Sequence, residues 1–137
     1  YDFVIDLLCT NPLKTSKDID AVIKKIERTN ADSVIGVSKL EEHHPIRIKK
    51  IINDRIVNFK FKEKPGSTRQ SLKPVAYIRN GSIYACRWGK RKKRIGSKNS
   101  RPYIMPELKS ANIDSKLDLI LARQLIKMYP RNYIKKT

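Results

Sequence analysis

Cysteine and histidine are scarce in this chain of 137 residues, and their spacing does not fit a zinc site. The two cysteines, Cys9 and Cys86, lie far apart, and the two histidines, His43 and His44, are adjacent. Structural zinc sites take four such ligands, usually from closely spaced pairs. Both cysteines lie in apolar, strand-like stretches, so we expect two reduced thiols in the core rather than a disulfide.

Glycine, acidic residues and long apolar runs are also scarce. The five glycines are scattered, and none forms the glycine-rich loop that cradles a phosphate. No leader peptide is recognisable, and no apolar stretch approaches the roughly 20 residues that cross a bilayer. We therefore expect a cytoplasmic protein with no membrane partner. The 13 acids face 31 lysines and arginines, and a net charge of +18 favours binding of anions without identifying their class.

The first 40 residues have the pattern of an α/β fold. An apolar run over residues 3–9 predicts a buried strand of a parallel sheet. Ser16 is a candidate N-cap, and apolar residues spaced three and four apart over 19–26 predict an amphipathic helix. A second apolar run over residues 33–38 completes a strand, helix and strand unit.

The rest of the chain changes pattern several times. Alternating residues over 46–51 and 56–61 with a polar turn between them predict a hairpin. Residues 82–88 predict another strand. A final helix is expected to bury one apolar stripe (Leu117, Ile120, Leu121, Leu125 and Met128) and to stop at Pro130. Between them, residues 88–101 form a basic segment that contains Lys90, Arg91, Lys92, Lys93, Arg94, Lys98 and Arg101.

Polar residues that could bind a ligand cluster in four short segments. Thr10 and Asn11 follow the first strand, where open α/β sheets bind ligands. The second segment is 43–47. The third combines Arg69 and Gln70 with 77–84, and its arginines could hold a carboxylate. In the fourth, 110–115, Asn112 and Asp114 should point to the same side and could supply oxygen ligands to Mg²⁺. Each segment taken alone is also compatible with an ordinary turn or solvated loop.

Taken in order, the four segments resemble the acylneuraminate cytidylyltransferases, which are CMP-sialic acid synthetases. The family's Gln-Pro-Thr-Ser-Pro-Leu-Arg-Thr pattern is similar to residues 8–15, and its His-His-Pro-x-Lys pattern to residues 43–47. Its Arg-Gln-x-Leu-Pro and Asn-Gly-Ala-Ile-Tyr patterns are similar to residues 69–72 and 80–84. Its Ser-Ile-Asp-Ile-Asp-Thr pattern is similar to residues 110–115. The resemblance extends from Tyr1 to about Met128.

This resemblance implies a fold and a reaction. The fold would be a Rossmann-like, three-layer α/β/α nucleotide-diphospho-sugar transferase fold, with residues 44–75 as an inserted dimerisation extension in a homodimer. The 2-hydroxyl of a nonulosonic acid would attack the α-phosphate of CTP, releasing pyrophosphate and forming a CMP-sugar with the help of Mg²⁺. By resemblance, Asp114 and Arg69 are the catalytic candidates, and Asp114 and Asn112 the metal ligands. The expected substrate-binding residues are Thr10, Asn11, Arg47, Arg69, Asn80 and Tyr84.

The chain also departs from the family pattern. Leu8 replaces a glutamine and cannot hydrogen-bond a sugar hydroxyl, and Asn112 replaces an aspartate, which removes one charge from the metal site. Arg47 replaces a lysine, which keeps the charge and changes its geometry. The family's CTP-binding loop has no counterpart. We therefore expect residues 1–137 to be a single partial catalytic domain, N-terminally incomplete and inactive alone.

Two alternatives remain at this point. The chain could be a cytidylyltransferase homologue whose activity is impaired by Leu8 and Asn112. It could also be a basic nucleic-acid-binding module, with Trp88 and Tyr103 available for base stacking. Much of the positive charge lies on predicted helix faces and in the last residues, however, so we do not expect nucleic acid to be the main partner.

Overall fold

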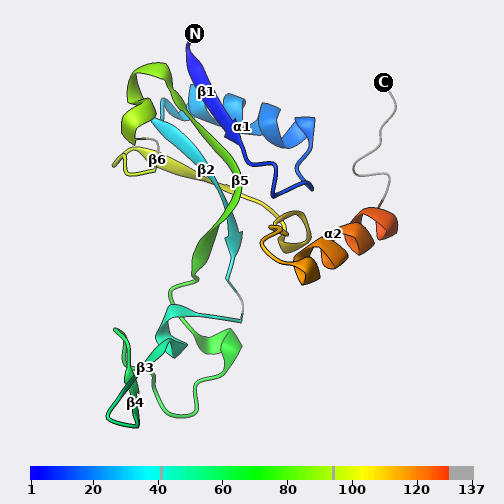
Figure 1. Cartoon of the computed structure of the whole chain (residues 1–137). Coiled ribbons are helices and arrows are strands. Elements are labelled where there is room, and N and C mark those ends of the chain that lie inside the picture. Colours follow the sequence, from blue (N-terminus) through cyan, green and yellow to red (C-terminus); the bar gives the residue numbers. More distant parts are fainter. Residues whose placement is uncertain (41, 94, 130–137) are drawn as a thin grey trace. The chain divides into compact units, whose positions relative to one another are not determined.

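A computed structural model of the chain describes residues 1–40, 42–93 and 95–129 (Figure 1). The chain divides into two compact units. The first, which we call the sheet unit, combines residues 1–38 with the chain from residue 79 onwards. The second, the hairpin unit, is Lys39–Ile78. Each unit is described by itself below.

A mixed four-stranded sheet organises the sheet unit. Its strand order is β1-β5-β2-β6. The strands are β1 (Phe3–Leu7), β5 (Tyr77–Arg87), β2 (Ser33–Lys39) and β6 (Ser100–Ile104). β1 pairs antiparallel with β5, whereas β2 pairs parallel with β6. The prediction of an α/β fold is confirmed, but placing residues 3–9 in a buried strand of a parallel sheet was wrong, because β1 is a half-buried edge strand that ends at Leu7.

Helix α1 (Ser16–Thr29) follows β1, as the apolar spacing predicted. Its N-cap is Thr15 rather than Ser16, and the Asp18 side chain accepts a hydrogen bond from the Thr15 backbone N–H at 2.8 Å. This reciprocal arrangement is a capping box. The helix ends at Asn30, whose positive φ of 48° closes the last turn.

The core of the sheet unit lies between α1 and the sheet. Val22 and Ile26 of α1 pack against Val34 of β2 and against Ile83 and Ala85 of β5. All five are buried, and each large side chain contributes roughly 1.5–3 kcal/mol through removal from water. Among the residues that the structure describes, the α-helices are α1 and α2, so a three-layer arrangement stays a prediction.

The hairpin unit contains the predicted hairpin, with β3 (Lys49–Ile52) paired antiparallel to β4 (Arg55–Asn58). The turn residues Asn53 and Asp54 both have positive φ, 48° and 60°. This is the backbone that a two-residue hairpin turn requires, and Asn and Asp tolerate it better than most residues. The unit also contains the short 3-10 helices η1 (Pro45–Arg47) and η2 (Arg69–Ser71).

The last part of the sheet unit contains η3 (Trp88–Lys93), η4 (Glu107–Lys109) and α2 (Lys116–Met128). Ser115 caps α2 by accepting a hydrogen bond from the Asp118 N–H at 3.3 Å. The predicted buried stripe on α2 was largely wrong. Of its residues Leu125 is 8% exposed, whereas Leu117, Ile120, Leu121 and Met128 are 51–73% exposed. Pro130, the predicted helix stop, lies outside the described residues.

Two further expectations are corrected by the solvent exposure of the turn after β1. Cys86 is buried as predicted, but Cys9 is exposed. Leu8 is 38% exposed and is therefore not a buried leucine. Within the described part of the chain, no helix combines the length and apolar character needed to cross a bilayer.

Candidate functional site

Three of the segments that the sequence singled out meet in the sheet unit, beyond the end of β1. The Asn11 side-chain N–H donates to the carbonyl of Asn80 at 3.3 Å. The Asn80 side-chain N–H donates to the Ser110 hydroxyl at 3.1 Å. The Ile113 backbone N–H donates to the carbonyl of Thr10 at 2.7 Å. The turn after β1, the middle of β5 and the loop 110–114 are thus joined directly.

Asn80 lies at the centre of these contacts and is buried. Its side-chain oxygen accepts a hydrogen bond from the Ser82 backbone N–H at 3.1 Å. Gly36 on β2 leaves the space for this amide, because a Cβ at that position would lie 2.8 Å from the Asn80 side-chain oxygen. The small residue at position 36 and the amide at position 80 therefore depend on each other.

Two other amides in this region have unsatisfied oxygens. The side-chain oxygens of Asn11 and Asn112 are buried and accept no hydrogen bond from the protein, and the Ser82 hydroxyl is likewise unpaired. Buried polar atoms are seldom left unpaired, because desolvating them costs about 1–3 kcal/mol each. These atoms are therefore candidates for contacts with a water, a cation or a ligand hydroxyl. We call Asn11, Asn80 and Asn112 the asparagine cluster.

Asn112 and Asp114 lie side by side, as the sequence predicted. The Asn112 side-chain N–H donates to the Asp114 carboxylate at 2.7 Å. No group of three acidic, histidine or cysteine side chains that could hold a metal occurs in the described part of the chain. Mg²⁺ often uses only one or two carboxylates and completes its shell with water and phosphate oxygens. Asp114 and the unpaired Asn112 oxygen could hold such an ion if the amide turned its oxygen towards Asp114.

Lys14 fixes the turn after β1, a role that the sequence reasoning did not assign. Its ammonium group donates to the carbonyls of Leu8 at 2.6 Å and Asn11 at 2.5 Å. Burial lowers the pKa of Lys14, and the nearby Cys9 opposes that change. A lysine shortly after a strand end is an ordinary surface residue by pattern, so the sequence carried no distinguishing signal.

Asp18 is a second residue that the sequence reasoning missed. It is 5% exposed and contacts Thr15, Tyr103 and Lys109. Burial acts to raise the pKa of Asp18, but hydrogen bonds from Thr15, Lys109 and Tyr103 outweigh it and hold the pKa below its usual value. Burial, together with the hydrogen bond to Asp18, raises the pKa of Tyr103 to about 12. The Thr-x-x-Asp pattern could have predicted the cap but not the distant partners.

The other predicted site residues are Tyr84, Arg47 and Arg69. Tyr84 is half-buried and pairs with Asp6 in the β1–β5 register, so it lies within the body of the sheet. Arg47 and Arg69 belong to the hairpin unit. Arg47 forms an ion pair with Glu63 at 3.5 Å, and Arg69 approaches Glu42 at 3.9 Å.

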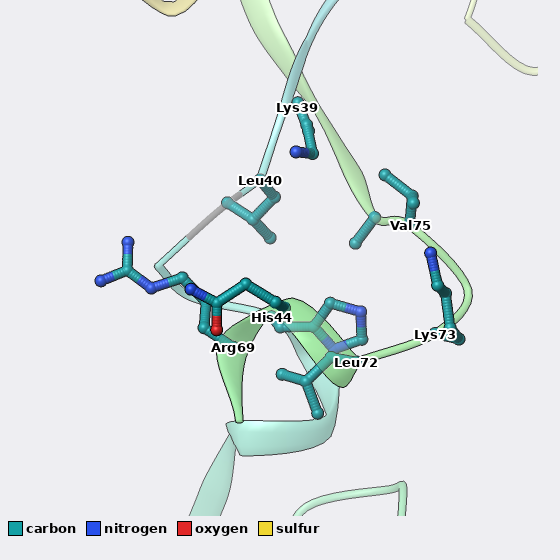
Figure 2. A pocket seen from close by; sticks show the side chains of 9 residues that line it. Lys39, Leu40, His44, Arg69, Leu72, Lys73 and Val75 are labelled. Atoms are coloured by element: carbon teal, nitrogen blue, oxygen red, sulfur yellow. The ribbon is translucent and has the colours of Figure 1, made fainter. Parts of the chain in front are cut away.

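A pocket of about 190 Å³ lies within the hairpin unit, beside Arg69 (Figure 2). His44 is one of the residues that line this pocket, and the Ile46 backbone N–H donates to the His44 Nδ1 at 3.3 Å. Nε2 therefore carries the proton and donates to the carbonyl of Pro74 at 2.9 Å. The described residues that line this pocket include the cationic Lys39, Arg69 and Lys73 and no acid. This composition favours the binding of an anionic group.

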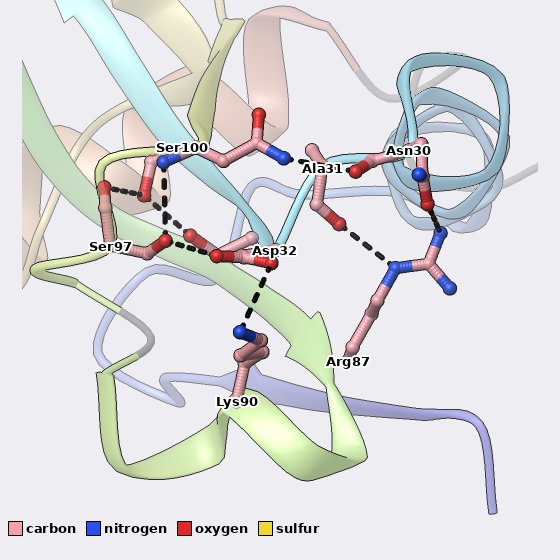
Figure 3. Close-up of polar contacts among 9 residues, drawn as sticks. Asn30, Ala31, Asp32, Arg87, Lys90, Ser97 and Ser100 are labelled. Atoms are coloured by element: carbon pink, nitrogen blue, oxygen red, sulfur yellow. Dashed lines mark hydrogen bonds and ion pairs between the residues drawn. The ribbon is translucent and has the colours of Figure 1, made fainter.

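In the sheet unit, basic residues at the end of the sheet opposite the asparagine cluster have structural partners (Figure 3). Arg87 donates to the Asn30 side chain at 2.8 Å, and Lys90 lies 3.9 Å from Asp32. The Ser97 hydroxyl donates to the other Asp32 carboxylate oxygen at 2.5 Å. The Ser97–Asp32 contact joins the starts of β2 and β6, and the Asp32 contact gives Lys90, in the basic segment, a structural partner.

Trp88, one of the aromatic residues considered for base stacking, already has neighbours. The Arg91 guanidinium lies over its ring at 4.7 Å, and the Tyr1 ring centroid is 6.2 Å away. Tyr103 donates its hydroxyl to Asp18. The two aromatic side chains expected to stack on bases in a nucleic-acid-binding module thus already have contacts within the chain. Arg94 of the basic segment lies outside the described residues.

Comparison with known proteins gives a distant match. No family model matches the chain. The post-translational flagellin modification protein B of Campylobacter coli is 28% identical over 131 residues. The match covers 93% of this chain and 54% of that protein, so the chain spans about half the length of the curated relative it matches.

Proposed function

We propose that the chain is part of a nucleotidyltransferase that activates a sialic-acid-like nonulosonic acid with CTP, giving a CMP-sugar and pyrophosphate. The observation that carries this proposal is the meeting of three segments, around Asn11, Asn80 and Asn112, that each resemble a motif of the cytidylyltransferases. They are separated by about 70 and 30 residues in the chain, and their convergence is what a shared ligand site requires. The relative's name describes post-translational modification of flagellin, and an activated sugar of the proposed kind could serve such a modification.

In the proposed reaction, the 2-hydroxyl oxygen of the sugar attacks the α-phosphorus of CTP. The bond from that phosphorus to the pyrophosphate oxygen breaks, and the hydroxyl proton leaves to solvent. Mg²⁺ would neutralise charge on the triphosphate when bound. The unpaired oxygen of Asn11 is suited to accept a hydrogen bond from a sugar hydroxyl, and the unpaired oxygen of Asn112 could join Asp114 as a metal ligand. Asp114 supplies the carboxylate that would face the metal.

The arginines complete the proposal. A nonulosonic acid carries a carboxylate, which an arginine can bind with two parallel hydrogen bonds. Arg69, which lines the cationic pocket, and Arg47 are the candidates, and both belong to the hairpin unit. We propose Tyr84, on β5, as a further residue that contacts the sugar. We also propose a homodimer formed through the hairpin. Ile51 and Ile56 are 75% and 76% exposed, and contact with a second copy would remove their apolar side chains from water.

A catalytically impaired homologue is the second candidate. Two observations favour it: Leu8 is half-exposed beside Gly81 and offers no hydrogen bond, and Asn112 brings no charge to the metal site. Its ligands would be those of the enzyme, bound without turnover. Turnover with any nonulosonic acid would eliminate this candidate.

Pyrophosphate release tests the proposal. The protein that contains this chain should be assayed with CTP, Mg²⁺ and a panel including sialic and legionaminic acids. We expect release that requires a nonulosonic acid. Asp114→Ala should reduce turnover by about 100-fold or more, because loss of a residue that only supports a metal ligand already costs about 10–100-fold. Asp20→Ala on the exposed side of α1 should leave turnover unchanged. Absence of release from the folded protein with every sugar would contradict the proposed activity.

A further inference from the structure

Asp18 has more hydrogen-bonding partners than helix capping requires. One of its oxygens, Oδ2, accepts from the Thr15 backbone N–H at 2.8 Å and the Thr15 hydroxyl at 2.6 Å. The other, Oδ1, accepts from the Tyr103 hydroxyl at 2.9 Å and lies 3.2 Å from the Lys109 ammonium, which also reaches Oδ2 at 3.0 Å. Oδ2 alone completes the capping box, so capping does not explain the second set of contacts.

These contacts join three elements that are far apart in the sequence. Asp18 is on α1, Tyr103 is on β6 and Lys109 ends η4, with 85 and 91 residues separating the partners from Asp18. Burying a charged pair is costly unless its geometry is good and its hydrogen bonds are satisfied. The side chains of Asp18 and Lys109 are only 6% and 23% exposed, so this cost applies to them. They meet the condition, because the two charges are 3.0 Å apart and both Asp18 oxygens accept further hydrogen bonds.

Lys109 is followed directly by the loop 110–114. This loop is attached to the sheet by the Asn80 side chain, which donates to the Ser110 hydroxyl, and by the Ile113 N–H, which donates to Thr10. The Lys109–Asp18 contact is a third attachment at the start of the loop, and it carries full charges. Charge-assisted hydrogen bonds are about twice as strong as neutral ones.

We propose that Asp18 is a positioning residue, which fixes the loop 110–114 through Lys109 and thereby sets the location of Asn112 and Asp114. The significance for catalysis rests on the proposed function, but the structural coupling does not. Asp18 touches neither end of the Asn112–Asp114 pair, so it acts through the loop and not on a ligand.

Amide hydrogen exchange of the chain measures the coupling without any substrate. The Ser110 N–H is bonded to Glu107 and the Ile113 N–H to Thr10, and both should be protected. Asp18→Asn should speed exchange at these two amides by roughly tenfold while the amides of β2 keep their protection, as expected of local opening. Asp20→Asn, at an exposed position of α1, is the matched control and should change neither.

Lys109 provides a second test that leaves the cap of α1 intact. Lys109→Met should reproduce the faster exchange at Ser110 and Ile113, and Lys109→Arg should restore most of the protection because it keeps the charge. Exchange that rises equally throughout the sheet unit, or a Lys109→Met variant with the protection of the wild type, would overturn the proposal.

Kinetics then separate the inference from the proposed function. In the active protein, Asp18→Asn and Lys109→Met should each lower kcat by about tenfold or more, since misplacement of a catalytic group is costly. Lys109→Arg should keep much of the wild-type kcat, because it keeps the charge that pairs with Asp18. If the wild type releases no pyrophosphate, the proposed function fails while the exchange result stands. If turnover is unaffected although exchange rises, the loop is coupled to Asp18 but is not part of the catalytic site, which contradicts the positioning role.

Discussion

Replacing Gly36 with alanine would add a methyl group where the Asn80 side chain lies. The new Cβ would be 2.8 Å from the Asn80 side-chain oxygen, 3.3 Å from the Ile83 carbonyl oxygen and 3.4 Å from the Ile83 nitrogen. The first distance is shorter than any stable carbon–oxygen contact. The Ile83 backbone is held in β5 by its pairing with Leu7, so the Asn80 side chain is the group that must move.

The cost follows from what Asn80 would lose. Its side chain makes one hydrogen bond with the Ser82 N–H and one with the Ser110 hydroxyl, both at 3.1 Å. Losing each costs about 1 kcal/mol or somewhat more in a buried setting. If Asn80 stays in place, the strain of overpacking is about 1–3 kcal/mol instead. Since these costs are alternatives, we expect Gly36→Ala to reduce the free energy of unfolding by about 2–3 kcal/mol.

Urea unfolding followed by circular dichroism measures this loss. With a slope of about 1–3 kcal/mol per molar urea, the midpoint should fall by about 0.7–3 M. Gly89→Ala is the matched control, because nothing lies within 4 Å of its added Cβ, and its midpoint should stay or rise slightly. In an Asn80→Ala background, the further cost of Gly36→Ala should shrink. Equal midpoints for Gly36→Ala and Gly89→Ala would refute this packing of Asn80.

Three further predictions concern stability. Leu125→Ala should lower the free energy of unfolding by about 2–4 kcal/mol and exposed Leu117→Ala by less than about 0.5 kcal/mol; the reverse order in thermal melts would contradict the orientation of α2. Ser115→Ala should cost about 1 kcal/mol through loss of the α2 cap, and an unchanged melting temperature would refute the capping role. Because the folded-state pKa of Asp18 is lowered, its contribution is present above the unfolded pKa of about 3.9 and is lost as pH falls through the folded value. Asp18→Asn should therefore flatten the acid side of the stability profile, and parallel profiles would contradict the assignment.

Local patterns were enough to predict several elements. The apolar spacing over residues 19–26 predicted α1, because a period near 3.6 residues places those side chains on one face. The polar pair Asn53-Asp54 between alternating residues predicted the hairpin turn. These features depend on residues a few positions apart, so the sequence alone contains the relevant information.

Other features depend on distant partners and could not be predicted. The antiparallel pairing of β1 with β5 joins residues about 80 positions apart, and no property of residues 3–9 distinguishes it from parallel pairing. The Asp18–Lys109 pair has the same limitation. The apolar spacing of α2 predicted a buried stripe, but whether an apolar face is covered depends on which surface is present to cover it.

Three of the residues predicted for the site lie together in the structure, and their role in binding a ligand stays a prediction. Asn11, Asn80 and Asn112 do converge, and the ordered motifs that pointed to them were informative because each contributes a side chain to one region. Arg47 and Arg69 lie in the hairpin unit, Lys39–Ile78, which contains the residues 44–75 that the family resemblance marked as an insertion. The unpaired oxygens were also beyond prediction, since pairing is a property of the packed structure.

The most direct test of the central claim is the response of the asparagine side chains to a sugar acid. The protein containing this chain, labelled with ¹⁵N at asparagine, should be titrated with sialic and legionaminic acids while its side-chain amide resonances are recorded. We predict saturable shifts at Asn11, Asn80 and Asn112 with at least one sugar. The side-chain resonances of Asn30 and Asn99, which are hydrogen-bonded to each other at the opposite end of the sheet, should stay unchanged. Saturable binding of a sugar that leaves all three resonances of the asparagine cluster unmoved, or no binding of any nonulosonic acid, would contradict the account.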